Sequence, residues 1–452
     1  MNTKSLPLSL IILLTTINGL AALAAADAPW KPLFNGSDLA GWTQRGGKAQ
    51  YNAQQGLIVG RIAPNTANAF LCTDETYADF ILEYDMFITP GLNSGVQIRS
   101  LSDPAYHNGR VHGYQVEADT AKRAWSAGIY DEARRGWLYP LAANPKARNA
   151  FKNGQWNHFR VEAIGPHLRT FLNGIPCADL VDDMTPNGFI ALQVHNIGKN
   201  QTLANLPVKW RNLRIITDQP EKWTLPLDYS IPQVNLMPNT LSPRERDLGY
   251  QFLFDGANVG AWRTPAQDRF PVKGWKVQDN QLVGTGQQGG DIISRQTFRN
   301  FELKLDFRLT KGANSGVKYL VNPTPKKGEL VGPEYQLLDD RNHPDAKRGA
   351  AGNRTLGALY DLIPPHAPYG KRVKWNGWNQ LFIRVQGDHV EHYLNNILLV
   401  KYQRNNQMFN ALVARSKYAK YPNFAKHDTG HLLLQDHGDT VYFRSIKIRI
   451  LP

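Results

Sequence analysis

The sequence predicts an all-β protein made of two tandem β-sandwich domains of jelly-roll type. Three observations predict it: a set of motifs occurs twice in the same order, short segments alternate apolar and polar residues, and glycine turns separate these segments. The chain has 452 residues, of which 42% are hydrophobic and 20% charged. This composition is typical of a globular protein, and the length allows two or three domains with sizeable cores.

The first 26 residues have the pattern of an export signal. Lys4 supplies the positive start, residues 6–23 are mostly apolar, and the small residues at 21–26 provide cleavage positions. An uncleaved membrane anchor is the alternative, although small residues rather than charges end the apolar run. We therefore expect a periplasmic or secreted protein, and no later run is long and apolar enough to span a membrane.

Six matched blocks show that the chain contains an internal repeat. Residues 33–42 (LFNGSDLAGW) recur at 253–262 (LFDGANVGAW), and the NSGV of 93–96 recurs at 314–317. The remaining blocks start at 114 and 335, 130 and 360, 156 and 378, and 188 and 430. Units of about 200 residues are too large for a solenoid, so they predict tandem domains. The predicted boundaries are 27–217 for the first domain, 218–247 for a proline-bearing linker and 248–452 for the second domain.

Within each copy the pattern is that of β-strands. Residues 80–87 (FILEYDMF) and 301–308 (FELKLDFR) alternate apolar with polar positions, as half-buried strands do. Residues 158–163 followed by 168–174 predict a hairpin, because a short turn separates two strand-like runs. Regular short strands joined by glycine turns favour an antiparallel jelly roll.

Charge and cysteine content exclude some classes of function. The net charge of +14 is spread along the chain without a basic block, so we predict no nucleic-acid partner. The only two cysteines are Cys72 and Cys177, too few for a cysteine-built zinc site. After export they would form either a disulfide or two buried thiols.

Three predicted strands of the first copy place polar side chains on one sheet face. Alternate residues of a strand point to the same side, so in 114–119 the odd positions share the face opposite the core. An ordinary solvated face is the alternative, but such a face is usually richer in Lys, Glu and Thr. The side chains expected on this face are Gln97, Arg99, Gln115, Glu117, Asp119, Gln193 and His195.

A segment at 130–137 is predicted to form a loop over that face. It contributes Tyr130, Asp131, Glu132, Arg135 and Trp137. Aromatic rings beside carboxylates and amides are suited to sugar recognition. The second copy has a related set, with Leu338 standing where Glu117 stands in the first: Gln336, Asp340, Tyr360, Asp361, Gln435 and His437.

Taken together, the LFNGxxLxxW, NSGVQ, GYQVE, GIYDE and LQxH motifs resemble the 3-keto-disaccharide hydrolase family. The resemblance covers both copies and nearly the whole mature chain. It implies a concanavalin A-like sandwich that cleaves glycosides already oxidised at C3 by a separate glycoside 3-dehydrogenase. A 3-keto group acidifies the C2–H bond, so a base removes that proton, the C1 substituent leaves, and water then adds.

The resemblance also suggests roles. In the first copy we expect His195 or Glu117 as base with Asp131 and Glu132 as acid or orienting groups, and in the second His437 supported by Asp361. A divalent metal is an alternative way to polarise the ketone, although no ligand spacing demands one. The expected substrate-binding residues are Gln97, Arg99, Gln115, Asp119, Tyr130, Arg135, Trp137, Gln193, Gln336, Asp340, Tyr360 and Gln435.

Two other functions compete with catalysis. A non-catalytic carbohydrate-binding protein would keep the same fold and the same polar face, and an interaction protein of a polysaccharide-degrading complex would keep the fold alone. Convergence of His195, Glu117 and Asp131 within hydrogen-bond reach would favour catalysis. A mixed protein, with one catalytic copy and one binding copy, is a further alternative.

Overall fold

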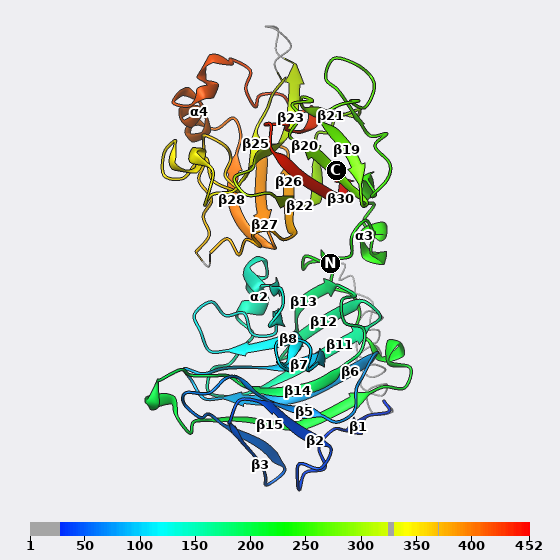
Figure 1. Cartoon of the computed structure of the whole chain (residues 1–452), viewed down its shortest axis with the longest axis vertical. Coiled ribbons are helices and arrows are strands. Elements are labelled where there is room, and N and C mark those ends of the chain that lie inside the picture. The colour runs from blue at the N-terminus through cyan, green and yellow to red at the C-terminus, as the bar shows by residue number, and fades with distance from the viewer. Residues whose placement is uncertain (1–27, 324–329, 369) are drawn as a thin grey trace, which may run out of the picture. The chain divides into compact units, whose positions relative to one another are not determined.

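The computed structural model describes residues 28–323, 330–368 and 370–452 (Figure 1). The chain forms two compact units. One contains the described residues up to 134 together with 146–178 and 183–230, and the other contains 135–145, 179–182 and 231–452. The predicted export signal at 1–26 lies outside the described residues, and no helix of the described part is long and apolar enough to cross a membrane.

The first sandwich consists of two sheets, antiparallel except for the edge strand β16 (Val234–Asn235), which pairs in parallel with β13. One sheet has the spatial order β13 (Ile175–Val181), β12 (His167–Leu172), β11 (Trp156–Ile164), β6 (Phe80–Ile88), β15 (Pro207–Ile216), β4 (Leu57–Arg61) and β3 (Gln50–Gln54), with β1 (Lys31–Pro32) beside β15. The other has the order β10 (Gly136–Tyr139), β9 (Ile129–Glu132), β8 (His112–Asp119), β7 (Asn93–Leu101), β14 (Phe189–Val194), β5 (Ala69–Thr73) and β2 (Trp42–Gly46). The predicted hairpin is confirmed, because β11 and β12 pair in antiparallel register.

The second sandwich repeats this plan. Its larger sheet has the order β19 (Trp275–Gln278), β20 (Gln281–Thr285), β30 (Thr440–Ile450), β22 (Phe301–Leu309), β26 (Asn379–Gln386), β27 (His389–Leu394) and β28 (Ile397–Gln403), with β17 (Gln251–Phe254) beside β30. Its smaller sheet has the order β18 (Trp262–Arg263), β21 (Ile292–Ser294), β29 (His431–Leu434), β23 (Asn314–Pro323) and β24 (Leu330–Val331), with β25 (Glu334–Leu338) beside β23. The two sandwiches are tandem jelly rolls of the concanavalin A-like type, as predicted.

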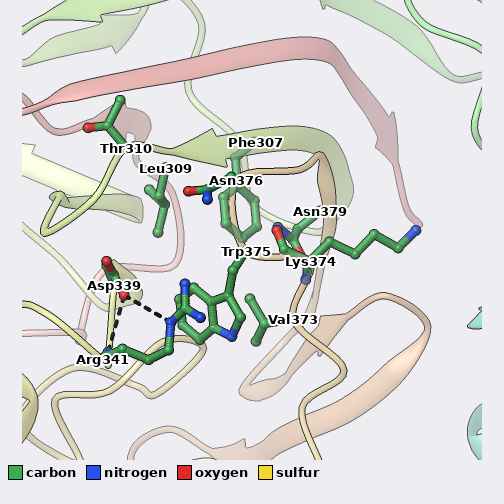
Figure 2. Close-up of a pocket in the computed structure, with 10 residues that line it drawn as sticks. All are labelled: Phe307, Leu309, Thr310, Asp339, Arg341, Val373, Lys374, Trp375, Asn376 and Asn379. Atoms are coloured by element: carbon green, nitrogen blue, oxygen red, sulfur yellow. Dashed lines mark hydrogen bonds and ion pairs between the residues drawn. The ribbon is translucent and has the colours of Figure 1, made fainter. Parts of the chain in front are cut away.

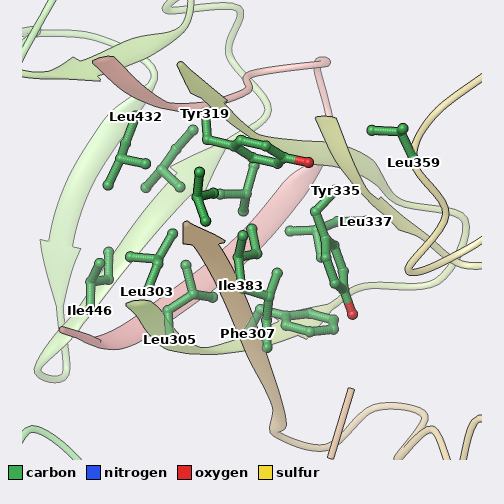
Figure 3. Packing of buried hydrophobic residues seen from close by; sticks show 14 of the residues in the cluster. Leu303, Leu305, Phe307, Tyr319, Tyr335, Leu337, Leu359, Ile383, Leu432 and Ile446 are labelled. Carbon is green, nitrogen blue, oxygen red and sulfur yellow. The ribbon is translucent and has the colours of Figure 1, made fainter. Parts of the chain in front are cut away.

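The core of each sandwich follows the predicted alternation. In β22 the residues at every second position, from Phe301 through Phe307, are almost completely buried. They pack against residues of the facing sheet such as Tyr319 and Leu337 (Figure 3). In β8 the inward residues Tyr114 and Val116 are fully buried, which leaves their odd-numbered neighbours on the opposite face.

Short helices and one further strand complete the structure. These are η1 (Leu141–Ala143), α2 (Pro145–Arg148), η2 (Gln201–Leu203), η3 (Pro220–Trp223), β16 (Val234–Asn235), α3 (Pro243–Asp247), η4 (Pro344–Lys347), α4 (Gln407–Ala414) and η5 (Lys417–Lys420). The stretch 218–247, predicted as a linker, is therefore structured, and α3 begins with a capping box between Ser242 and Glu245. Cys72 and Cys177 are both buried thiols and do not form a disulfide.

Candidate active site

In the first copy, adjacent strands bring four predicted residues together on the outer face of the β7–β8–β14 sheet. We call Gln97, Gln115, Glu117 and Gln193 the first-copy face. The Gln115 Oε1 atom accepts hydrogen bonds from Gln97 Nε2 at 2.6 Å and Gln193 Nε2 at 2.8 Å, and Gln115 Nε2 donates to Glu117 Oε2 at 2.9 Å. Gly95 leaves the room for this, because a Cβ there would lie 2.7 Å from Gln115 Cγ.

Three hydrogen-bond donors bind the Glu117 carboxylate. Its Oε1 atom accepts hydrogen bonds from Asn93 Nδ2 at 2.6 Å and from an Arg123 guanidinium nitrogen at 2.8 Å. Arg123 also binds Asp119, so one guanidinium bridges both carboxylates. Burial raises the pKa of Glu117 to about 7, with Arg123 opposing the shift and Asp119 adding to it. The Gln193 Oε1 atom is buried and accepts no hydrogen bond from the described residues.

Two predicted residues of the first copy do not reach this face. Arg99 was expected beside Gln97, but the strand bulges after Ile98 and Arg99 has a left-handed backbone (φ 45°), so the alternation breaks. Its guanidinium instead binds the Ala78 and Gly165 carbonyls. Asp131 was expected on a covering loop, but it lies in β9 opposite Tyr114 and points into the sandwich.

The rest of the 130–137 segment was also predicted wrongly as a loop, since its ends form β9 and β10. Tyr130 lies opposite Gln115 and therefore shares its face. Glu132 binds Arg110 at 3.2 Å, Arg135 binds Asp182 through two hydrogen bonds, and Trp137 is buried in β10.

His195 lies just beyond the end of the strand that was predicted to carry it. Strand β14 ends at Val194, one residue earlier, and the half-buried imidazole contacts the Asn196 carbonyl through Nδ1 at 2.7 Å. Because Asp131 points inward, His195, Glu117 and Asp131 do not converge, so the arrangement that would favour catalysis in the first copy is not present.

The register of the strands corrects the predicted alignment of the two copies. Gly95 lies opposite Glu117, whereas the matching Gly316 lies opposite Gln336. The backbone hydrogen bonds support this register. The Glu117 N–H donates to the Gly128 carbonyl and the Glu117 carbonyl accepts from Ala127, and Gln336 forms the same two bonds with Ala358 and Gly357. Gln336, not Leu338, therefore occupies the Glu117 position, and Glu334 occupies the position of Gln115.

In the second copy, Lys318, Glu334, Gln336 and Gln435 form the corresponding second-copy face. Lys318 lies directly opposite Glu334, and the Gln435 N–H donates to the Gly316 carbonyl next to it. Gln336 Nε2 donates to Asn314 Oδ1 at 3.0 Å, while its buried Oε1 accepts no hydrogen bond from the described residues.

The Glu334 carboxylate is buried, and among residues 28–323, 330–368 and 370–452 no group forms a hydrogen bond with it. No side chain of the described residues donates to it, and its neighbours act through charge alone. Burial raises the pKa of Glu334, against the lowering effects of Lys318, Lys417 and His437 and the raising effect of Asp291. A Cβ at Gly316 would collide with Glu334 Oε1, so this glycine makes room for the carboxylate.

A hollow of about 260 Å³ lies over the Lys318 end of this face. Lys318, Lys417, Tyr418 and Gly332 contribute to its wall. Burial lowers the pKa of Lys417, and the Lys417 ammonium lies 4.0 Å from the centre of the Tyr360 ring. Three lysines line this hollow, and two of them, Lys318 and Lys417, interact electrostatically with the Glu334 carboxylate.

The other predicted residues of the second copy do not line this hollow. Tyr360 donates its backbone N–H to the Glu334 carbonyl and therefore matches Tyr130. Asp361 accepts from Arg354 and from the Lys417 backbone N–H, so it positions the chain that carries Lys417. Asp340 binds Lys371 and the Leu356 N–H, away from the face, and His437 is exposed.

Sequence reasoning missed Glu334, Lys318 and Lys417. Lys318 follows the NSGV motif directly and Glu334 precedes the Tyr-Gln pair, so counting strand positions from both motifs would have found these two. Lys417 lies outside both motifs. Among the described residues, no group of three or more His, Cys, Asp or Glu side chains is placed to hold a metal ion.

The chain is similar to known proteins over both copies. The model of the 3-keto-alpha-glucoside-1,2-lyase-like domain matches residues 29–216 and 249–449. A Bacteroides thetaiotaomicron protein named 3-keto-disaccharide hydrolase is 33% identical over 231 residues, which are 45% of this chain and 79% of that protein.

Two solved Parabacteroides distasonis proteins, both provisionally described as glycosyl hydrolases, are also similar. The first is 32% identical and covers 48% of this chain and all of its own, with a TM-score of 0.43. The second is 22% identical and covers 45% of this chain and 84% of its own, with a TM-score of 0.34. Because the family model matches both regions and the Bacteroides thetaiotaomicron relative is similar as well, the chain belongs to the 3-keto-alpha-glucoside-1,2-lyase-like family.

Proposed function

We propose that this protein cleaves glycosides that carry a keto group at C3, and that the second-copy face is its active site. The observation that carries the proposal is the Glu334 carboxylate, which is buried, accepts no hydrogen bond from the described residues, and interacts electrostatically with Lys318 and Lys417. A carboxylate without donors is a stronger base than one that is saturated with them. Family membership and the curated 3-keto-disaccharide hydrolase relative support the choice of substrate.

The chemistry assigned to this face begins with proton abstraction. Glu334 takes the proton from C2, whose acidity comes from the neighbouring ketone, and the electron pair moves toward the C3 oxygen. The ammonium groups of Lys318 and Lys417 stabilise the negative charge that develops there. Burial favours this step, because it raises the pKa of the base and strengthens its interaction with both cations.

Elimination and hydration follow. The electron pair returns from the enolate, the bond between C1 and the leaving oxygen breaks, and that oxygen takes a proton. The exposed His437, which interacts electrostatically with Glu334, is the group we assign to this transfer. Water then adds at C1 and a proton returns to C2, so the sum of the steps is hydrolysis.

In this proposal the first copy binds sugar and does not catalyse the reaction. Three donors bind the Glu117 carboxylate and stabilise its charged form, which makes it a weaker base than a carboxylate without donors. The buried Gln193 Oε1 retains an unused acceptor for a hydroxyl group. Export to the periplasm or the medium and a separate dehydrogenase that makes the 3-keto substrate complete the proposal.

The direct test uses a 3-keto-glucoside and its unoxidised parent. We expect the purified protein to release the aglycone from the keto form only. A parallel reaction with a chelator separates metal-dependent from metal-independent cleavage, since only the former loses activity. Equal binding of both glycosides with no release from either would replace this proposal with the binding-protein hypothesis.

A further inference from the structure

A small pocket in the second unit contains Arg341 stacked on Trp375 (Figure 2). A larger hollow of about 320 Å³ shares Asp339, Arg341 and Asn376 with this pocket, and its wall also contains Lys311 and Asn342. A volume of this size is sufficient for a small ligand or one or two sugar rings. The hollow belongs to neither of the two sheet faces described above.

Arg341 is positioned so that its charged edge remains available. Its guanidinium carbon lies 4.3 Å from the centre of the Trp375 ring, and its Nε lies 3.9 Å from Asp339 Oδ1. No acceptor among the described residues forms a hydrogen bond with the guanidinium, and about half of the side chain (53%) is exposed. Stacking on an aromatic ring restricts an arginine without using its N–H groups.

Neutral donors of the protein hold the Asp339 carboxylate in place. It accepts the Gly312 N–H at 2.9 Å, Asn342 Nδ2 at 2.6 Å and the Arg341 N–H at 3.2 Å. These three bonds occupy most of its lone-pair sites. The exposed ammonium of Lys311 adds a second positive charge, so cations outnumber carboxylates on the wall by two to one.

The first copy keeps the loops but lacks these side chains. In the first copy the Gly91 N–H donates to the Thr120 hydroxyl, directly after β8. In the second copy the Gly312 N–H donates to the Asp339 carboxylate, directly after β25. In both copies an asparagine side chain closes the loop before β11 or β26 through the same two backbone bonds to a lysine. Counting from these bonds, the first copy has Pro90, Thr120, Asn153 and Gly154 where the second has Lys311, Asp339, Trp375 and Asn376.

From this geometry we infer that the hollow is a binding site for an acidic sugar, a uronic acid residue whose carboxylate pairs with the free edge of Arg341. The planar guanidinium matches a carboxylate through two parallel hydrogen bonds. Lys311 supplies a second charge contact, and Asn342 Oδ1 and the Asn376 amide are available to sugar hydroxyls. The inference is independent of the catalytic proposal, because none of these residues belongs to either sheet face.

The experiment measures binding of trigalacturonate by calorimetry to the full mature protein. We expect Arg341→Gln to weaken binding at least about tenfold, because two charge-assisted hydrogen bonds are lost. Arg341→Lys keeps the charge without the fork and should recover only part of the loss. Trp375→Ala should also weaken binding by releasing Arg341, whereas Arg415→Gln, which removes another exposed cation of the same unit, should leave binding unchanged.

The sugar specificity is tested with the same protein. A neutral trisaccharide should bind at least about tenfold more weakly than trigalacturonate, since it cannot form the paired contact. Equal binding of the two, or unchanged binding by both Arg341→Gln and Trp375→Ala, would overturn the inference. Tighter binding of a sulfated trisaccharide would overturn the assignment to a carboxylate. Cleavage activity is not part of the readout, so failure here leaves the catalytic proposal untouched.

Discussion

The two copies place a carboxyl and an amide on the same pair of strand positions in opposite order. The first copy has Gln115 followed by Glu117, and the second has Glu334 followed by Gln336. The exchange moves the acid by two residues along the strand and keeps it on the same face. One sandwich framework therefore carries two different electrostatic sites.

The neighbours of each carboxyl determine what it can do. Asn93 and Asn314 occupy the same position in the two copies, but Asn93 donates its amide N–H to Glu117, whereas Asn314 accepts from the Gln336 amide. The difference follows because a carboxylate can only accept a hydrogen bond, while a glutamine amide can also donate one. Asp119 anchors the Arg123 that covers Glu117, and the second copy has Leu338 at that position. In the first copy three donors bind Glu117, whereas in the second copy no described donor forms a hydrogen bond with Glu334.

The largest expected effect comes from restoring the first-copy order in the second copy. The double variant Glu334→Gln, Gln336→Glu removes the proposed base from its place beside Lys318. We expect kcat for 3-keto-glucoside cleavage to fall by about 10²–10⁴-fold, the usual contribution of a general base. The reverse exchange in the first copy, Gln115→Glu with Glu117→Gln, is the matched control and should preserve kcat. Full activity of the Glu334→Gln, Gln336→Glu variant would contradict the proposal that the second copy catalyses cleavage while the first copy binds sugar.

Arg123 should matter for stability and not for chemistry. Arg123→Ala leaves two buried carboxylates without their shared cation, so we expect a loss of about 3 kcal/mol in the free energy of unfolding. Urea denaturation measures this loss. Arg110→Ala breaks the exposed pair with Glu132 and should cost less than about 1 kcal/mol. Equal costs for the two variants would contradict the buried-network description.

The raised pKa of Glu117 predicts a pH dependence for the first copy. Because the folded pKa of about 7 lies above the unfolded value of 4.5, the stabilisation is complete below pH 4.5 and is lost as the pH rises through 7. Glu117→Gln mimics the neutral form and should remove this loss, which is worth up to about 3 kcal/mol. Urea curves from pH 4 to pH 8 should thus diverge between wild type and variant, and parallel pH profiles would be the opposing result.

The smallest effect is expected at Gln193. Gln193→Met removes the unused acceptor while Gln97 continues to donate to Gln115, so stability should change by no more than about 1 kcal/mol. If the first copy binds sugar, KM should rise about threefold to tenfold with kcat unchanged. The exposed Gln278→Met is the control. A fall in kcat at constant KM would place Gln193 in the catalytic step instead.

Much of the fold and part of the site could be predicted from sequence, since both depend on local periodicity. The alternation in 301–308 and the repeated motifs were sufficient for two sandwiches, and the odd positions of β8 identified Gln115 and Glu117. Arg99 was misplaced because a bulge with a left-handed residue has no signature in a non-glycine sequence. Glu334 was missed because the two copies were aligned on the residue pair Tyr-Gln. The register between neighbouring strands, which inter-strand hydrogen bonds set, aligns Glu334 with Gln115 instead.

The central claim, that Glu334 and not Glu117 removes the C2 proton, is tested most directly by hydrogen exchange. A 3-keto-glucoside is incubated in D₂O, and deuterium at C2 of the early product is measured by NMR. Wild type and Glu117→Gln should incorporate deuterium at similar rates, while Glu334→Gln should incorporate almost none. Incorporation that persists in Glu334→Gln and disappears in Glu117→Gln would contradict the account.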